Sequence, residues 1–271
     1  MPELPEVETT RRGIAPWMEG QRIRALVVRE RRLRWPVPRH MPATLRGIVV
    51  NRVERRGKYL LLRTERGTAL MHLGMSGRLR VLRADVTPGK HDHYDIVLDT
   101  GDCVRFSDPR KFGSLLWTAK DPQRHPLLAD LGPEPLEEAF DGDYLWRRAR
   151  GRRVSIKTFL MNAAIVVGVG NIYASEALYR AGLNPRRAAG RISRADMSRL
   201  AAAVREVLEE AVTFGGTTLR DFYGGDGEPG YFGRELRVYD RAGKPCLTCG
   251  TPIRQITQGQ RSTYFCPTCQ R

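Results

Sequence analysis

The sequence predicts an α+β protein: an N-terminal antiparallel β-sandwich preceded by a helix, then a helical domain, then a small metal-binding β-hairpin. Three observations indicate this. Short runs of β-branched, aliphatic and aromatic residues, separated by Gly, Pro and Asp, fill the first half of the 271-residue chain without helical crossovers. Helical periodicity dominates from about residue 131 to residue 215. Four of the five cysteines lie near the C-terminus. We expect domains at residues 1–130, 131–235 and 236–271.

The first element is expected to be a helix over Pro5–Arg12. Pro5 suits the first helical position, where a missing N–H costs nothing. Acidic residues in the first turn and basic residues in the last turn stabilise the helix dipole, and Gly13 suits the C-terminal cap. Eight strands are then expected at Ile23–Val28, Val49–Val53, Tyr59–Arg63, Ala69–His72, Leu79–Leu82, Tyr94–Leu98, Val104–Phe106 and Ser114–Thr118.

The helical domain is expected to follow a linker at Leu131–Pro135. One helix is predicted over Asn171–Ala181, because a glycine and a proline follow it. A longer helix is predicted after a capping box formed by Ser193 and Asp196. Its apolar residues at helical spacing are Met197, Leu200, Val204, Leu208 and Ala211. The glycine-rich segment Gly224–Gly233 is expected to be a mobile loop.

The four C-terminal cysteines form two pairs, Cys246 with Cys249 and Cys266 with Cys269, separated by 16 residues. Each pair presents two thiolates to one ion, so together they predict a closed tetrahedral site for one structural Zn²⁺. The alternative is two disulfides in a secreted protein, which the lack of a signal peptide disfavours. The fifth cysteine, Cys103, is expected to be a small buried hydrophobic residue.

Two strands between the cysteine pairs, Thr251–Ile256 and Ser262–Phe265, are expected to form a hairpin with Arg261 near its tip. Zinc would pin the base of this hairpin and hold Arg261 rigidly toward a phosphate. A solvated arginine is the structural alternative.

The formal net charge is +16 at pH 7, from 46 Lys and Arg against 30 Asp and Glu. Such an excess repels itself in a compact protein and favours a polyanionic partner, with nucleic acid first and an acidic membrane surface second. The membrane alternative is disfavoured, because the most apolar stretch, Ala163–Ala174, is too short to span and contains glycines. We expect a cytoplasmic monomer.

Gly168 and Gly170 precede the helix expected to begin at Asn171. Glycines before a helix N-terminus let backbone N–H groups approach an anion closely. A dinucleotide site is disfavoured, because the third glycine and the βαβ unit are missing. A phosphate of nucleic acid fits the charge better, and tight helix packing is the structural alternative.

Removal of the initiator Met, which is expected before a small residue such as Pro, would expose a secondary amine at Pro2. An α-amino group has a pKa well below that of lysine, so a larger fraction is nucleophilic near pH 7. Glu3 beside it could supply a proton. The signal is weak by itself, since many proteins begin with Met-Pro.

Six motifs follow one another along nearly the whole chain: PELPEVET at residues 2–9, RGKYL at 56–60, HLGMSG at 72–77, SDPRKFG at 107–113, GVGNIY at 168–173, and the four-cysteine finger. Together they resemble the formamidopyrimidine-DNA glycosylase family. Leu4 favours this family over its relative endonuclease VIII, which usually has Gly at that position.

The resemblance implies a bifunctional base-excision repair enzyme without an organic cofactor. It would remove oxidised purines, chiefly 8-oxoguanine and formamidopyrimidines, from duplex DNA and cleave the abasic site by β,δ-elimination. Pro2 matches the nucleophile that forms a Schiff base, and Glu3 matches the proton donor that helps to open the sugar ring. Lys58 matches a phosphate contact and proton donor in β-elimination, and Arg261 matches the finger arginine of δ-elimination. Glu6 matches a supporting carboxylate, although its place near a helix N-terminus is an equally good explanation.

The resemblance also implies a helix–two-turn–helix motif, in which Asn171 would hold a phosphate. His91, Arg110 and Arg153 match further DNA contacts. A metal site at His91-Asp92-His93 is disfavoured, because no further ligand is evident nearby. DNA would lie in a basic cleft between the first two domains.

Met75, Arg110 and Phe112 match residues that fill the void left by an extruded base. An apolar wedge and a planar cation suit that role, although core packing is the structural alternative for Met75 and Phe112. The Gly224–Gly233 segment matches a loop that covers the extruded base. The segment Met161–Ala164 departs from the family, because its relatives usually have acidic and further polar residues there.

Two other functions stay open. One is an endonuclease VIII-type glycosylase for oxidised pyrimidines, and the other is a non-catalytic zinc protein that only binds lesions. The joint presence of Pro2, Glu3, Lys58 and Arg261 argues against the second.

Overall fold

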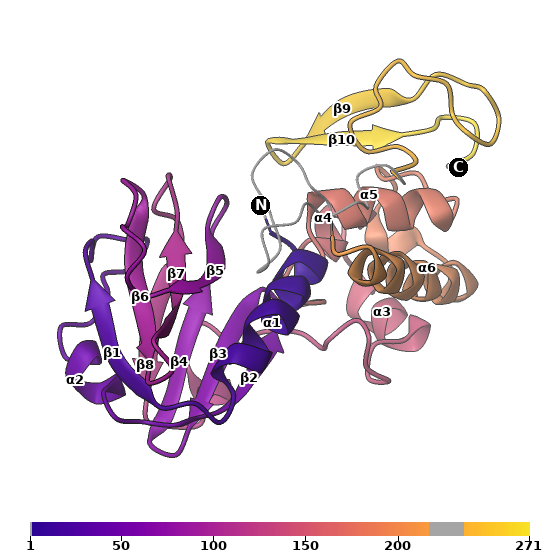
Figure 1. Ribbon diagram of the computed structural model, residues 1–271. Coiled ribbons are helices and arrows are strands. Elements are labelled where there is room, and N and C mark those ends of the chain that lie inside the picture. The colour runs from indigo at the N-terminus through magenta and orange to yellow at the C-terminus, as the bar shows by residue number, and fades with distance from the viewer. Residues whose placement is uncertain (1, 217–235) are drawn as a thin grey trace. The chain divides into compact units, whose positions relative to one another are not determined.

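A computed structural model describes residues 2–216 and 236–271 (Figure 1). The chain divides into two compact units. The first contains the described residues up to Ala129 together with Phe214–Gly216, and the second contains Asp130–Thr213 and the described residues from Leu236 onward. The expected Gly224–Gly233 loop lies outside the described residues.

The first unit is a sandwich of two antiparallel four-stranded sheets, as predicted. One sheet has the order β1-β6-β7-β5 and the other the order β2-β3-β4-β8. The strands are β1 (Ile23–Val28), β2 (Val50–Arg56), β3 (Tyr59–Thr64), β4 (Gly67–His72), β5 (Arg78–Arg83), β6 (Asp92–Leu98), β7 (Asp102–Ser107) and β8 (Ser114–Thr118).

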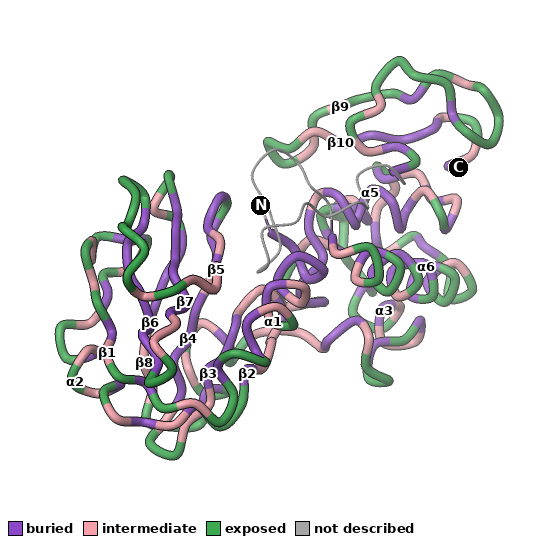
Figure 2. The backbone as a smooth tube through the Cα atoms, in the orientation of Figure 1, coloured by how far each residue is buried: buried purple, intermediate pink, exposed green. Residues whose placement is uncertain are grey.

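The hydrophobic core lies between the two sheets. Alternate residues such as Leu60 and Leu62 of β3 enter it, because successive side chains of a strand point to opposite faces. They meet residues such as Ile96 and Phe106 of the other sheet. Figure 2 shows this burial along the strands, whereas much of the connecting backbone is exposed.

Helix α1 (Leu4–Met18) packs along β2 (Figure 1). The expected end of this helix at Gly13 is wrong. Ile14 and Met18 are fully buried in the core. Burying two such side chains contributes about 1.5–3 kcal/mol each, which outweighs the roughly 1 kcal/mol cost of a helical glycine. The chain instead turns at Gly20, whose φ is +77°. The short helices α2 (Met41–Leu45) and η1 (Pro122–Arg124) complete the unit.

The second unit contains helices and a C-terminal hairpin. The helices are α3 (Gly142–Ala149), α4 (Ile156–Leu160), α5 (Asn171–Arg180), η2 (Ala189–Arg191) and α6 (Arg194–Thr213), and the hairpin pairs β9 (Arg254–Gln258) with β10 (Arg261–Phe265). Helix α5 begins at Asn171 as predicted, and Gly182 follows its end with φ +69°. Before α6, the Ser193 hydroxyl accepts from the Asp196 backbone N–H at 3.0 Å.

Helices α3 and α4 lie in the region expected to be helical, but neither was predicted as a separate element, because they are only 8 and 5 residues long. Both are nevertheless capped. The Asp141 carboxylate accepts from the Tyr144 N–H at 2.6 Å, and the Ser155 side chain accepts from the Thr158 N–H. None of the helices in the described ranges combines the length and the apolar content that a membrane crossing requires.

Candidate nucleic-acid site and metal centre

Two buried carboxylates lie beside the N-terminal residues. Pro2 is buried, Glu3 directly precedes α1, and Glu6 lies in its first turn. Glu3 and Glu6 are each only 2% exposed. The backbone N–H of Glu3 donates to Glu6 Oε2 at 2.8 Å. Glu3 and Glu6 therefore form a capping box, which agrees with the helix N-terminus explanation for Glu6 and fixes the backbone at Glu3.

Gly216 belongs to this region although nothing in the sequence singled it out. Its φ is +82°, and a Cβ added there would lie 2.9 Å from Glu6 Oε1. A side chain at this position would therefore press on the carboxylate that holds Glu3.

Lys58 lies in the two-residue turn of the β2–β3 hairpin. Gly57 takes the first turn position with φ +57°, as a primed hairpin turn requires. Arg55 Nη1 donates to the Gly57 carbonyl at 3.2 Å, and Arg55 Nε donates to Glu8 Oε2 at 3.2 Å. Since Glu8 lies on α1, Arg55 connects the helix that begins beside Pro2 to the turn that presents Lys58.

His72 ends β4 and pairs with Tyr59, the residue after Lys58; the HLGMSG motif contains it, but no role was predicted for it. Its ring lies 4.8 Å from the Tyr59 ring, centroid to centroid, and its Nδ1 accepts from the Gly74 N–H at 2.9 Å. Burial, followed by the positive charges of Lys58 and Arg34, lowers the pKa of His72 to about 4. The imidazole is therefore neutral at pH 7 and adds no charge beside Lys58.

The structure brings the three expected void-filling residues into two loops that touch. Met75 and Phe112 are 38% and 41% exposed, so neither packs in the core. The Arg110 guanidinium carbon lies 4.9 Å from the centre of the Phe112 ring. A Cβ added to Gly74 would lie 2.4 Å from the Phe112 carbonyl carbon, so only glycine allows this approach of the two backbones.

Asp108, at the start of the second loop, is fully buried, and the SDPRKFG motif that contains it did not point to a role for it. It accepts from the Ser76 hydroxyl at 2.7 Å and from the Gly113 N–H at 2.8 Å. Its backbone N–H donates to the carbonyl of His91, an exposed residue expected to contact DNA. The two loops and His91 are thus joined through one residue.

The alternative metal site at His91-Asp92-His93 gains no support. His93 Nε2 bonds to the Asp108 carbonyl at 2.7 Å. The Asp92 carboxylate bonds to Arg80 and to Ser107. In the part of the chain that the structure describes, the only group of ligands arranged for a metal is the cysteine cluster.

In the second unit, residues at the N-terminal ends of α4 and α5 hold Ser262, which follows Arg261 in β10. The Asn171 amide donates to the Ser262 carbonyl at 3.0 Å. Lys157 Nζ donates to the same carbonyl at 2.9 Å and to Thr263 Oγ1 at 2.7 Å. Both α4 and α5 therefore brace β10 immediately beside the exposed Arg261.

Lys157 is 2% exposed, which is rare for a lysine, and no sequence motif pointed to it. Arg153 is exposed on the segment before α4. A cavity of about 410 Å³ adjoins this region, with Arg152, Lys157, Gln258 and Arg261 among its lining residues. Cationic groups at the hairpin tip and before α4 suit contacts with phosphates.

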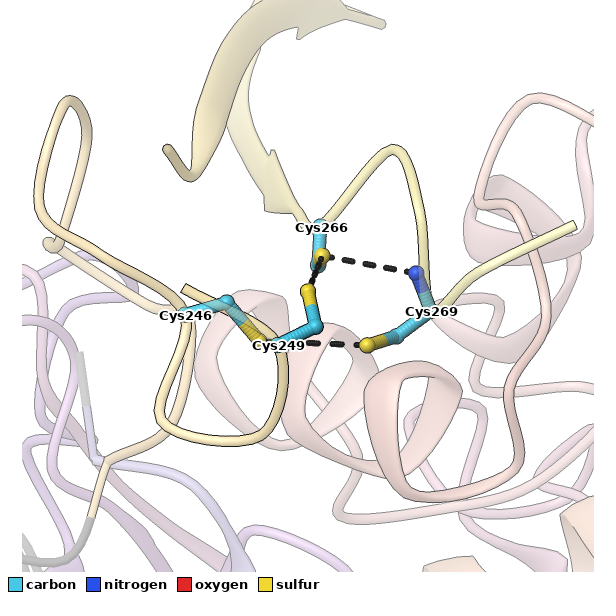
Figure 3. A group of neighbouring side chains, drawn as sticks. All are labelled: Cys246, Cys249, Cys266 and Cys269. Carbon is cyan, nitrogen blue, oxygen red and sulfur yellow. Dashed lines mark hydrogen bonds between the residues drawn. The ribbon is translucent and has the colours of Figure 1, made fainter. Parts of the chain in front are cut away.

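The four C-terminal cysteines converge as the zinc prediction requires (Figure 3). All four Sγ atoms lie within 4.8 Å of one another, with 3.5 Å between those of Cys249 and Cys266 and 3.9 Å between those of Cys246 and Cys269. A tetrahedron of sulfurs at 2.3 Å from zinc has edges of about 3.8 Å, whereas a disulfide needs about 2.05 Å. The residues fit one structural Zn²⁺, and four thiolates leave no position for a substrate.

Comparisons with known proteins match three successive parts of the chain. Family models match the formamidopyrimidine-DNA glycosylase N-terminal domain at residues 1–115, the H2TH domain of that enzyme at residues 131–223, and the zinc finger found in FPG and IleRS at residues 243–271. Two proteins named formamidopyrimidine-DNA glycosylase, from Alkalilimnicola ehrlichii and Methylococcus capsulatus, are each 58% identical to this chain, with 100% of both chains covered.

Solved structures agree with these matches. The MutM (Fpg) protein of Thermus thermophilus has a TM-score of 0.89 at 41% identity, covering 99% of this chain and 98% of that one. The Lactococcus lactis Fpg in complex with DNA containing an abasic site has a TM-score of 0.92 at 31% identity, with 99% of both chains covered. A Lactococcus lactis FPG mutant in complex with Fapy-dG DNA has a TM-score of 0.93 at 31% identity, with 100% of both covered.

Proposed function

Because the chain belongs to the formamidopyrimidine-DNA glycosylase family, a family of DNA glycosylases and AP lyases, we propose that it excises 8-oxoguanine and formamidopyrimidines from duplex DNA and cleaves the resulting abasic site. The supporting observation is the position of Pro2 directly before two buried carboxylates at the start of α1. The Lactococcus lactis complexes with Fapy-dG DNA and with abasic DNA support the same substrates.

Pro2 acts as the nucleophile in this proposal once Met1 is removed. Its amine nitrogen attacks C1′ of the damaged nucleoside, and the bond from C1′ to the base breaks, with the base taking the electron pair. Glu3 supplies a proton that helps to open the sugar ring, and Glu6 holds Glu3 in place through its backbone N–H. A secondary amine then gives a cationic iminium, which acidifies the C2′ hydrogen.

Strand cleavage follows from that iminium. Loss of the C2′ proton expels the 3′-phosphate oxygen by β-elimination, with Lys58 contacting phosphate and supplying a proton. Arg261 promotes the second, δ-elimination on the 5′ side. Lys58 is held by the β2–β3 turn and Arg261 by the braced hairpin, so both cations are on rigid elements.

The remaining expected residues bind DNA. His91, Arg110, Arg153 and Asn171 contact the duplex, and Met75, Arg110 and Phe112 occupy the void left by the extruded base. Zinc, when bound by the four cysteines, keeps the finger folded and takes no part in the chemistry. In this proposal residues 1–130 form the catalytic domain, residues 131–235 the DNA-binding helical domain and residues 236–271 the finger, working as a cytoplasmic monomer.

The test is cleavage of duplex oligonucleotides that each contain one lesion. We expect release of 8-oxoguanine and formamidopyrimidine with strand cleavage at the lesion, and much slower release of an oxidised pyrimidine such as 5-hydroxycytosine. Preferred release of the pyrimidine would favour endonuclease VIII-type specificity. Tight binding of lesion DNA without cleavage would favour a non-catalytic lesion-binding protein.

A further inference from the structure

We propose that Asp108 is the positioning residue that joins the Met75 loop to the Arg110–Phe112 loop and holds them as one wedge for the void in the duplex. This inference rests on the proposed function. It concerns a residue inside the first unit that touches neither the sugar nor the leaving base, and acts through the side chains it positions.

The Asp108 carboxylate spans the two loops with both oxygens. Oδ1 accepts from the Ser76 hydroxyl at 2.7 Å and from the Arg110 N–H at 3.2 Å. Oδ2 accepts from the Gly113 N–H at 2.8 Å. Ser76 directly follows Met75, and the two backbone donors bracket Phe112. Each residue expected in the wedge therefore either donates a hydrogen bond to this carboxylate or is the sequence neighbour of a residue that does.

The backbone of Asp108 fixes the same region. Its carbonyl accepts from the Lys111 N–H at 3.2 Å and bonds to His93 Nε2 at 2.7 Å. Lys111 has φ +55°, a conformation that non-glycine side chains rarely adopt, and its Nζ lies 2.5 Å from Glu30 Oε2. The loop between Asp108 and Gly113 is thus held in a specific and unusual conformation rather than in a relaxed turn.

Asp108 is fully buried, and no Lys, Arg or His side chain of the described residues forms a salt bridge with it. Burying a carboxylate is costly unless hydrogen bonds satisfy it, and here three neutral donors do so. A carboxylate is an acceptor only, which is what three converging donors require. An amide at this position would direct N–H groups at one of those donors.

The exposure of the wedge explains why such an anchor is needed. Met75 and Phe112 are large apolar side chains that remain about 40% exposed. The hydrophobic effect favours folding them onto nearby apolar surface. A buried carboxylate that fixes the loops on both sides prevents this collapse, so the wedge is preorganised before DNA binds.

The test is a double-mutant cycle between Asp108→Asn and Met75→Ala/Phe112→Ala, in the full-length zinc-bound protein. Excision of 8-oxoguanine from duplex DNA is measured beside cleavage of an abasic site in single-stranded DNA, which has no void to fill. We expect Asp108→Asn to slow duplex excision about 10- to 100-fold, as for loss of a buried hydrogen bond, and to change single-strand cleavage by less than about twofold. In the background that lacks Met75 and Phe112, the same substitution should have little further effect.

Controls separate loss of positioning from loss of fold. Asp95→Asn alters another buried carboxylate of the same sandwich, which pairs with Arg29 and Arg105 and touches neither loop. It should lower the melting temperature without selectively slowing duplex excision. Ser76→Ala removes one donor and keeps the carboxylate, so it gives a milder form of the same selective loss if Asp108→Asn does not fold.

Equal losses on duplex and single-stranded substrates, or additive effects in the cycle, would overturn the assignment of Asp108. So would excision by Asp108→Asn at the rate of the unaltered protein. Failure of the unaltered protein to cleave either substrate would instead reject the proposed function.

Discussion

Arg55 donates a hydrogen bond from Nε to Glu8 Oε2 at 3.2 Å, and both side chains are largely buried. Through its Nη1, Arg55 also holds the Gly57 carbonyl in the turn before Lys58. Burial raises the pKa of Glu8, but hydrogen bonds from Arg11 and Arg12 and the charge of Arg55 outweigh this and hold it below its ordinary value. Glu8 is therefore ionised at neutral pH, and the link between α1 and the Lys58 turn persists.

Replacing Arg55 should uncouple these two elements. We expect Arg55→Met to slow β-elimination at a preformed abasic site about tenfold, because Lys58 loses its fixed position relative to Pro2. The measurement is single-turnover cleavage of abasic duplex DNA. Glu54→Gln is the matched control, since its ion pair with Arg63 is half-exposed and contributes little. Equal rates for Arg55→Met and the unaltered protein would contradict the proposed link.

The buried Lys157 should determine how the reaction divides between its two eliminations. Lys157→Met removes both hydrogen bonds that its ammonium makes to β10, next to Arg261. We expect a larger share of β-elimination product relative to δ-elimination product, and a loss of stability of about 1–3 kcal/mol. Gel separation of the two products measures the ratio. Lys244→Met, at an exposed lysine of the same unit, should leave the ratio unchanged.

Zinc should be needed for DNA binding but not for folding of the β-sandwich. Cys249→Ser removes one of the four ligands and should lower zinc content below one ion per chain, weakening binding to an abasic duplex by at least about tenfold. Metal analysis and fluorescence anisotropy measure the two effects. Cys103→Ala, at the buried cysteine outside the cluster, should retain one zinc. Full binding by zinc-free Cys249→Ser would contradict a structural role.

His72 should make stability depend on pH in the acid range. Its pKa is about 4 in the folded protein and about 6.5 in an unfolded chain. Between these two pKa values the unfolded state therefore binds more protons than the folded state. The free energy of unfolding is unaffected by His72 above about pH 6.5 and decreases as the pH falls toward 4.

The variant His72→Asn keeps an acceptor for the Gly74 N–H but does not titrate. Urea unfolding at pH 7 and pH 4.5 should show the unaltered protein losing about 2 kcal/mol more than this variant. A similar loss in both would assign the acid sensitivity to other groups.

Local signals in the sequence predicted much of this architecture. The strand at Ser114–Thr118 and the start of α5 at Asn171 were both predicted correctly, because turn residues and helix-boundary signals act locally. The zinc cluster was also predicted, because the spacing of its four cysteines can be read directly from the sequence. Helix α1 extends past Gly13 because tertiary burial of Ile14 and Met18 outweighs a local breaker.

The supporting residues of the site could not be predicted in the same way. Asp108, Lys157 and Arg55 act through partners that are 32, 105 and 47 residues distant in sequence. In the sequence each is an ordinary charged residue, because its partners come close to it only in the folded protein. The roles proposed for the residues that act on DNA rest instead on resemblance of motifs, which follow one another along the chain.

The most direct test is borohydride trapping on a duplex that contains 8-oxoguanine, with removal of Met1 verified by intact mass. Reduction of the iminium should leave a stable protein–DNA adduct, located by mass spectrometry on the N-terminal tryptic peptide Pro2–Arg11, and Pro2→Gly should sharply reduce it. An adduct located on Lys58, or no adduct with protein whose Pro2 amine is free, would contradict catalysis by the N-terminal proline.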